Sequence, residues 1–144
     1  MADCRRVLSA FVNGTGPAAQ GIQGLWIGAG LDAWDSVPPP PPTGTETVLV
    51  DPNPFLVPVA AMTLEFLSPT NTVSATPTNR LQISIPIGPG QPPWPDGNHA
   101  TGNLREFGLA AQLGGNLVLL NYVIHPVIAK DPASTLDRTI WLEF

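Results

Sequence analysis

The clearest pattern along the chain is the alternation of apolar and polar side chains in three segments. Residues 60–67, 80–87 and 139–144 each carry apolar side chains at about every second position. A period of two is typical of a strand with one buried face. Pro86 cannot donate a hydrogen bond to a neighbouring strand, so residues 80–87 are expected to lie at a sheet edge or to end there.

Short apolar runs between turn signals predict further strands. They lie at residues 21–30, 48–50, 104–109 and 117–124. The last run is apolar at almost every position, which predicts a strand between two layers or at a subunit interface. Together, about seven short strands predict a mainly β fold. We expect an antiparallel β-sandwich or an open β-barrel, with long loops rich in Pro and Gly and with little helix.

The N-terminal residues and a proline run differ from these strands. Residues 1–24 predict an N-terminal arm or a short helix, and residues 25–144 a single β-rich domain with a Pro-rich insertion at 37–47. Five consecutive prolines, residues 38–42, predict an extended polyproline II segment. We interpret it as a stiff surface spacer, and the alternative is a ligand for a protein that binds Pro-rich peptides. We expect the N-terminus, which matches a signal peptide poorly, to stay in the mature chain.

Composition narrows the possible partners. The 144 residues include 12% charged residues and have a net charge of −5, and Lys130 is the single lysine. This balance cannot build the basic face that nucleic acids require. The low charge content instead favours a surface that is covered in an assembly. No apolar run reaches the roughly 20 residues of a membrane-spanning helix, so we expect no membrane span.

Candidate catalytic residues are few. Cys4 is the single cysteine, which excludes an internal disulfide, and it has no histidine near it in the sequence. His99 lies in a loop, and His125 follows the apolar run at 117–124. They lack the spacing that brings two metal ligands together. We interpret His99 as a solvated loop residue and His125 as capping a strand end, and we expect no enzyme activity, metal or other cofactor.

Tryptophans are the remaining candidates for ligand contact. There are four of them, Trp26, Trp34, Trp94 and Trp141. Exposed aromatic rings can stack on sugars, but we interpret these four as core or interface residues. A stand-alone β-sandwich binding module, for example for glycans, therefore stays as the alternative function.

Several segments in a fixed order resemble one family. They are Ile27-Gly28-Ala29-Gly30, Trp34-Asp35 with the Pro-rich sequence to residue 50, Thr76-Pro77-Thr78-Asn79 before a strand, Arg105-Glu106-Phe107-Gly108-Leu109, residues 120–130 with His125-Pro126, and the terminal apolar strand 135–144. The series covers roughly residues 25–144. It resembles the tail-fibre and tail-collar-like attachment proteins of phage tails and contractile injection systems.

This resemblance implies a structural role. The expected function is an adaptor, collar or fibre-attachment subunit that joins appendages to a baseplate or tail. The expected partners are other copies of the chain, in a trimer or a ring that matches the tail symmetry, and other tail, baseplate or fibre proteins. Assembly in the cytoplasm would precede incorporation into the particle. We expect residues 1–47 to contact the particle and the C-terminal strands to hold the subunits together.

The segment 104–109 supplies the first interface candidates. Alternation predicts that the odd-numbered side chains from Arg105 share one face and that the even-numbered ones share the other. Arg105 and Glu106 cannot then pair with each other. Each needs a partner elsewhere, such as Asp137, Arg138 or a neighbouring subunit, unless the segment is an ordinary strand with two exposed charges. The candidate interface residues are Arg105, Glu106, Phe107, Leu119, Val123, His125 and Trp141.

Overall fold

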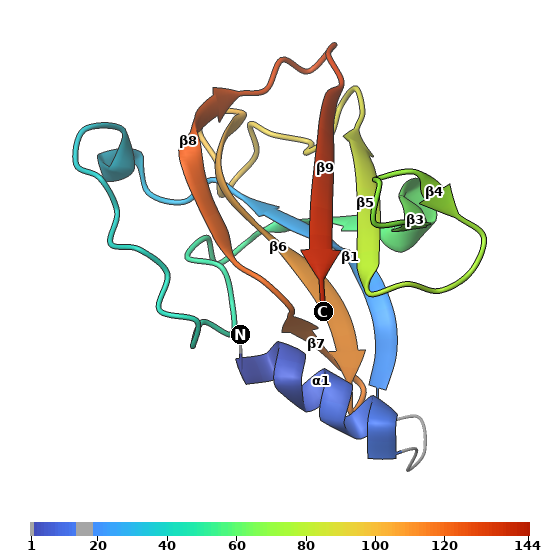
Figure 1. Cartoon of the computed structure of the whole chain (residues 1–144). Coiled ribbons are helices and arrows are strands. Elements are labelled where there is room, and N and C mark those ends of the chain that lie inside the picture. Colours follow the sequence, from blue (N-terminus) through green and yellow to red (C-terminus); the bar gives the residue numbers. More distant parts are fainter. Residues whose placement is uncertain (1, 14–18) are drawn as a thin grey trace.

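Two antiparallel β-sheets form a β-sandwich, as the alternating segments predict (Figure 1). We describe them from a computed structural model, which covers residues 2–13 and 19–144. The first sheet contains β1 (Ala19–Gly28), β2 (Phe55–Pro58), β6 (Asn103–Leu113), β7 (Asn116–Leu119) and β8 (Val123–Ala129). The second contains β3 (Thr63–Leu67), β4 (Val73–Ser74), β5 (Arg80–Ile87) and β9 (Leu136–Glu143).

Strand β6 organises the first sheet. It pairs with β1 along one edge, and β1 in turn pairs with β2. Along its other edge, β6 pairs with β7 near its C-terminal end and with β8 near its N-terminal end. The second sheet has the strand order β4-β3-β5-β9. Pro86 therefore lies in an inner strand, at a position beyond the reach of β3.

The core lies between the two sheets. Its largest contribution from the second sheet is the alternating series Ile83, Ile85 and Ile87 of β5, each at most 1% exposed. The first sheet contributes buried side chains from β1, β2 and β6: Leu25, Ile27, Val57, Leu104, Phe107 and Leu109. Burial of side chains of this size is the main stabilising term in such a fold.

Three short helices complete the part of the chain that the structure describes. The helix α1 (Ala2–Asn13) contacts β1, β6 and β7 at one end of the sandwich (Figure 1). Two single 3-10 turns follow later in the chain, η1 (Asp32–Asp35) and η2 (Val59–Ala61). In the part of the chain that the structure describes, no helix has the length and hydrophobicity that crossing a bilayer requires. Since β1 begins at Ala19, it crosses the boundary that we expected at residue 25.

Two of the predicted strands are different in the structure. Residues 117–124 form two strands, β7 and β8, because Asn121 interrupts the pairing: its side-chain Oδ1 accepts the hydrogen bond from the Leu109 amide at 2.7 Å. Residues 48–50 form no strand. There the backbone is held by a side chain instead, since the Val50 amide donates to Glu106 Oε2 at 3.0 Å.

Candidate functional site

The most unusual feature of the sandwich is a buried carboxylate in the middle of β6. Glu106 is 0% exposed. Its Oε1 accepts a hydrogen bond from the Asp51 amide at 2.7 Å, and its Oε2 accepts one from the Val50 amide and one from the Tyr122 hydroxyl at 2.6 Å. A buried carboxylate is tolerated when such donors surround it. Glu106 therefore ties the loop at 50–51 and the β7–β8 connection to β6.

A second buried carboxylate continues this network. Asp51 Oδ2 accepts a hydrogen bond from the Ala29 amide and lies 2.9 Å from Nε2 of His99. The other ring nitrogen of His99 lies 2.8 Å from Oδ1 of Asp96. Trp94 stacks on the His99 ring, with 3.7 Å between the ring centroids. These contacts hold the long loop before β6 against the loop at residue 51.

Arg105, the neighbour of Glu106, forms the third part of the network. Its Nε and Nη2 donate to the two carboxylate oxygens of Asp35 at 2.8 and 2.7 Å, and its Nη1 donates to the Ala29 carbonyl at 2.9 Å. Asp32 adds an ion pair at 3.0 Å. The contact between Arg105 and Asp35 is bidentate, which is the strongest hydrogen-bonding geometry between an arginine and a carboxylate. It fastens η1 to the first sheet.

Two glycines of the segment 27–30 make room for this arrangement. A Cβ on Gly28 would lie 2.6 Å from Oε1 of Glu106. A Cβ on Gly30, which has a φ of +60°, would lie 2.5 Å from the Trp34 ring. The Gly-rich, Trp-Asp and Arg-Glu segments therefore meet in space, although more than 70 residues separate the first from the last.

The electrostatics of the network follow from these contacts. The hydrogen bond from Arg105 lowers the pKa of Asp35, and the same bond raises the pKa of Arg105. Burial raises the pKa of Tyr122, and its hydrogen bond to Glu106 raises this pKa further. The network therefore keeps Asp35 ionised and Tyr122 protonated near neutral pH.

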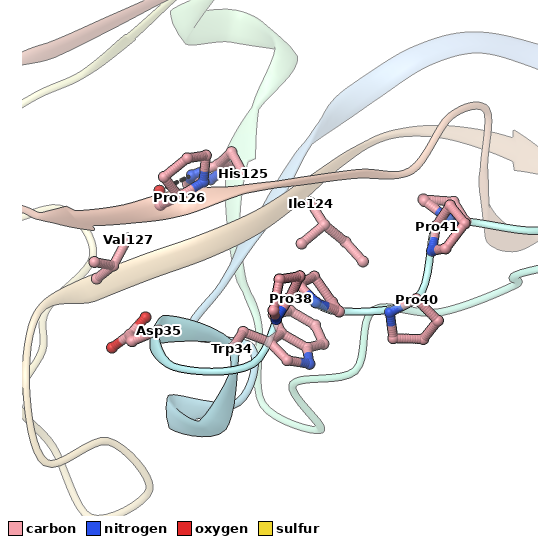
Figure 2. Close-up of a pocket in the computed structure, with 11 residues that line it drawn as sticks. Trp34, Asp35, Pro38, Pro40, Pro41, Ile124, His125, Pro126 and Val127 are labelled. Atoms are coloured by element: carbon pink, nitrogen blue, oxygen red, sulfur yellow. Dashed lines mark hydrogen bonds between the residues drawn. The ribbon is translucent and has the colours of Figure 1, made fainter.

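Two cavities adjoin this region. One, of about 540 Å³, lies over the network and is lined by residues that include Asp32, Asn98 and Arg105. The other, of about 440 Å³, lies between residues 38–42 and residues 124–127 of β8. Figure 2 shows the prolines of this run beside Trp34 and facing β8. The proline run, which we call the proline strap, thus lies along the sheet edge.

His125 lies within β8, beside the strap. Its Nδ1 is 2.7 Å from the carbonyl oxygen of Pro126, and its ring packs 5.8 Å from that of Phe107. Burial lowers the pKa of His125, and the positive charge of Arg138 lowers it further. Arg138 itself lies over the Phe107 ring, 4.6 Å from its centroid. His125 does contact a backbone carbonyl as we expected, but inside the strand instead of at its end.

The structure places most of the candidate interface residues inside the chain. Arg105, Glu106, Phe107 and Leu119 are between 0 and 7% exposed, Val123 and His125 are half-buried, and Trp141 is 56% exposed. The charges of Arg105 and Glu106 are therefore not exposed, and their partners are not Asp137 or Arg138.

Two further expectations about the site are corrected. His99 is 6% exposed, so it is not a solvated loop residue; the two carboxylates and the Trp94 ring around it account for its burial. Leu104 joins Phe107 and Leu109 in the core, because the β6–β8 pairing shifts register between Leu104 and Glu106. This irregularity breaks the strict alternation that we predicted for the segment.

Sequence reasoning missed the roles of Asp35, Asp51 and Tyr122. Each lies in a segment without periodicity, so its partner could not be found from the pattern. One signal was available: Arg105 and Glu106 stand among apolar residues, and charges in such a strand need partners. Asp35 and Asp51 both lie close to glycines or prolines in the sequence. At such residues a chain can turn back toward a strand.

The buried polar side chains of the network all have hydrogen-bond partners within the chain. Among the described side chains, those of residues 4–9 and 21–144, no buried nitrogen or oxygen lacks a hydrogen-bond partner. Over the same residues, no three His, Cys, Asp or Glu side chains come together as metal ligands would. The arrangement described here therefore fastens loops to β6. A scan against protein-family models and searches of curated proteins and of solved structures found no match to this chain.

Proposed function

We propose that this chain is a structural component of a phage tail or a contractile injection system. It would act as an adaptor, collar or fibre-attachment subunit that joins appendages to the baseplate or tail. The ordered resemblance of residues 25–144 to such proteins supports this role. Three of the resembling segments, the Gly-rich, Trp-Asp and Arg-Glu segments, pack together around Arg105 and Glu106. This packing adds support, because it gives the three segments one shared structural role in stabilising the fold.

The observation that carries the proposal is the amount of apolar surface left open on a chain with few charges. Charged residues make up 12% of the sequence, about half the usual share. Among the residues whose exposure the structure describes, twelve large apolar side chains are at least 36% exposed. They lie in α1, in the segment around the proline strap, on β3, β4, β7, β8 and β9, and just after β9: Leu8, Leu31, Val37, Val48, Val50, Leu64, Phe66, Val73, Leu117, Val127, Trp141 and Phe144. An assembly would cover such surface.

The two ends of the chain have different parts in this proposal. The helix α1 and the proline strap contact the particle, and the C-terminal strands hold copies of the chain together in a homo-oligomer. A polyproline segment is already extended and loses little conformational entropy when it lies along a neighbour. The described side chains of α1, residues 4–9, are not part of the main core cluster, and Leu8 among them is 53% exposed, which supports such a contact.

The experiment is incorporation into particles. In cells that make the tail or injection particle, the full-length chain, a variant lacking residues 1–13 and a Gly97→Ala control, where a Cβ meets no atom within 4 Å, are expressed in place of the original. We expect the full-length chain and the control in purified particles, measured by quantitative mass spectrometry. The truncated variant should be depleted at least tenfold while its circular dichroism in the β region is retained.

Purified particles that lack the full-length chain would contradict the proposal. So would particles of normal composition and infectivity or injection activity from cells without the gene. Incorporation of the truncated variant at full occupancy would contradict the role of α1 alone.

A glycan-binding module is the second candidate, and Trp141 is the observation that favours it. Its exposed ring lies on the outer face of the second sheet, its indole nitrogen donates to Gln82 at 2.8 Å, and Arg80 lies 6.0 Å from its centroid. Aromatic rings beside amide and guanidinium groups suit pyranose rings. A glycan array with the wild type and with Trp141→Ala tests this. Saccharide binding that the substitution abolishes would favour this candidate, and no binding above background would reject it.

A further inference from the structure

Strand β9 is an edge strand with one open side. It pairs with β5 along all eight of its residues, and no strand among the described residues pairs with its other side. Asp137, Thr139, Trp141 and Glu143 are exposed, whereas the residues between them are half-buried. β9 therefore presents a straight, regular edge to its surroundings.

The register identifies which backbone groups point outward. The Phe144 amide donates to the Asn79 carbonyl at 2.9 Å, so the pair just beyond Arg80 and Glu143 is hydrogen-bonded. In an antiparallel ladder, such pairs alternate with pairs whose groups point away. The even-numbered residues of β9 therefore bond to β5. The amides and carbonyls of the four odd-numbered residues, from Asp137 to Glu143, point to the open side.

The other sheet edges are protected against pairing. β4 has two residues, β7 has four, and β2 ends in Pro58. β8 is longer, but Pro126 interrupts its donors and the proline strap lies beside it (Figure 2). Short strands, proline and covering segments are the devices that keep edges from associating. β9 has no proline, lysine or bulge, so it stands out as an edge left free to pair.

The sequence of β9 fits a second copy of itself. An antiparallel pair must place inward residues opposite inward residues, which leaves two registers that overlap over seven residues of β9. A register centred on Ile140 places Asp137 opposite Glu143 of the other copy, two like charges. A register centred on Thr139 places Thr139 opposite itself, Leu136 opposite Leu142 and Asp137 opposite Trp141. The register centred on Thr139 places no two like charges opposite each other, so this register is favoured.

We propose that two copies of this chain pair through β9 about a two-fold axis at Thr139. The two second sheets then join into one continuous eight-stranded sheet. The pairs 137/141, 139/139 and 141/137 exchange two hydrogen bonds each, so the outward groups of these residues are satisfied. This pairing deepens the proposed homo-oligomer by making a dimer its building block, in place of a trimer. It needs no tail or baseplate, so its test is separate from that of the proposed function.

The first test is a charge placed on the two-fold axis. Thr139→Lys sets two lysines opposite each other at the centre of the pair, on an exposed edge where a monomer tolerates lysine. Thr63→Lys is the matched control, because Thr63 is also exposed and lies in the same cross-strand row, two strands away. Mass is measured by sedimentation equilibrium and the fold by circular dichroism.

We expect the wild type and Thr63→Lys to form an assembly with an even number of chains, the simplest being twice 15.2 kDa. Thr139→Lys should have at most half that mass and an unchanged spectrum. A wild type that stays monomeric at 100 μM or forms a trimer would overturn the proposal. An unchanged mass for Thr139→Lys would also overturn it.

The second test does not depend on how Thr139→Lys folds. With Cys4 replaced by Ser, Thr139→Cys places two thiols on the axis, where the Cα atoms of a hydrogen-bonded pair lie about 5.5 Å apart, within disulfide range. Thr63→Cys would place them five strand spacings apart, about 24 Å. Mild oxidation should link most of the Thr139→Cys chains and few of the Thr63→Cys chains. Equal linking of the two variants, or none in either, contradicts the pairing.

Discussion

The two sheets of this sandwich use their charged residues in opposite ways. In the first sheet, Arg105 and Glu106 are buried, and their partners lie in η1 and in loops of the same chain. In the second sheet, Glu143 is exposed and Arg80 is half-buried, and the two lie 3.9 Å apart. Buried pairs that lose a partner are costly, whereas exposed pairs contribute little. The first sheet therefore fixes the fold, whereas the second leaves one side of β9 without a partner strand among the described residues.

The long edge strands of the two sheets also differ, because one is protected against pairing and the other is open. The long edge strand of the first sheet, β8, has a proline in it and the strap beside it. That of the second sheet, β9, is regular over eight residues. A chain that protects one edge and leaves the other open is expected to form a closed pair instead of an open fibre.

Removing the buried carboxylate should have the largest effect. Glu106→Ala leaves the Val50 and Asp51 amides and the Tyr122 hydroxyl without their acceptor. We expect the free energy of unfolding to fall by about 3–5 kcal/mol, measured by urea denaturation. Glu65→Ala, on the second sheet, is the control and should change it by less than about 0.5 kcal/mol. Equal effects of the two substitutions would remove the contrast between the sheets.

A smaller effect is expected from filling the space at Gly108 of β6. A Cβ there would lie 2.6 Å from Leu119 Cδ2 and 2.7 Å from the Asn121 carbonyl oxygen, which cannot move without the backbone. Gly108→Ala should therefore destabilise the fold by about 1–3 kcal/mol. Gly97→Ala, with no atom within 4 Å of its Cβ, is the matched control. A thermal shift of the same size in both variants would show that β6 is packed more loosely than described.

The smallest expected effect concerns pH. Because its bond to Arg105 lowers the pKa of Asp35, this carboxylate stabilises the folded state above its ordinary pKa of 3.8, and the stabilisation is lost as the pH falls through the lower folded-state value. Asp35→Asn should therefore be less stable than the wild type at pH 7, with a difference that shrinks below pH 4. Urea denaturation at pH 7, 4 and 2.5 measures this. A difference that does not change with pH would argue against the ion pair as its source.

The sequence allowed prediction of the β-sandwich but not of the network. Alternation in β5 and β9 reflects strands with one face toward the core, and such strands follow directly from side-chain polarity. In β3, the alternating residues Leu64 and Phe66 are 39% and 36% exposed, so the alternation there predicted a strand but not a buried face. The network instead joins residues as far as 76 positions apart, most of them in segments between strands, where no periodicity exists. The division of 117–124 into two strands was also hidden, because it depends on one side-chain oxygen of Asn121 replacing a backbone acceptor.

The pairing that we propose places β9 of another copy on the open side of β9. Residue-resolved amide hydrogen exchange tests it most directly, measured at a high and a low protein concentration. The amides of Arg138, Ile140 and Leu142 donate within the chain and should exchange slowly at both concentrations. The amides of Thr139 and Trp141 should exchange slowly at high concentration and at least tenfold faster after dilution. Fast exchange of these two amides at both concentrations would contradict this pairing.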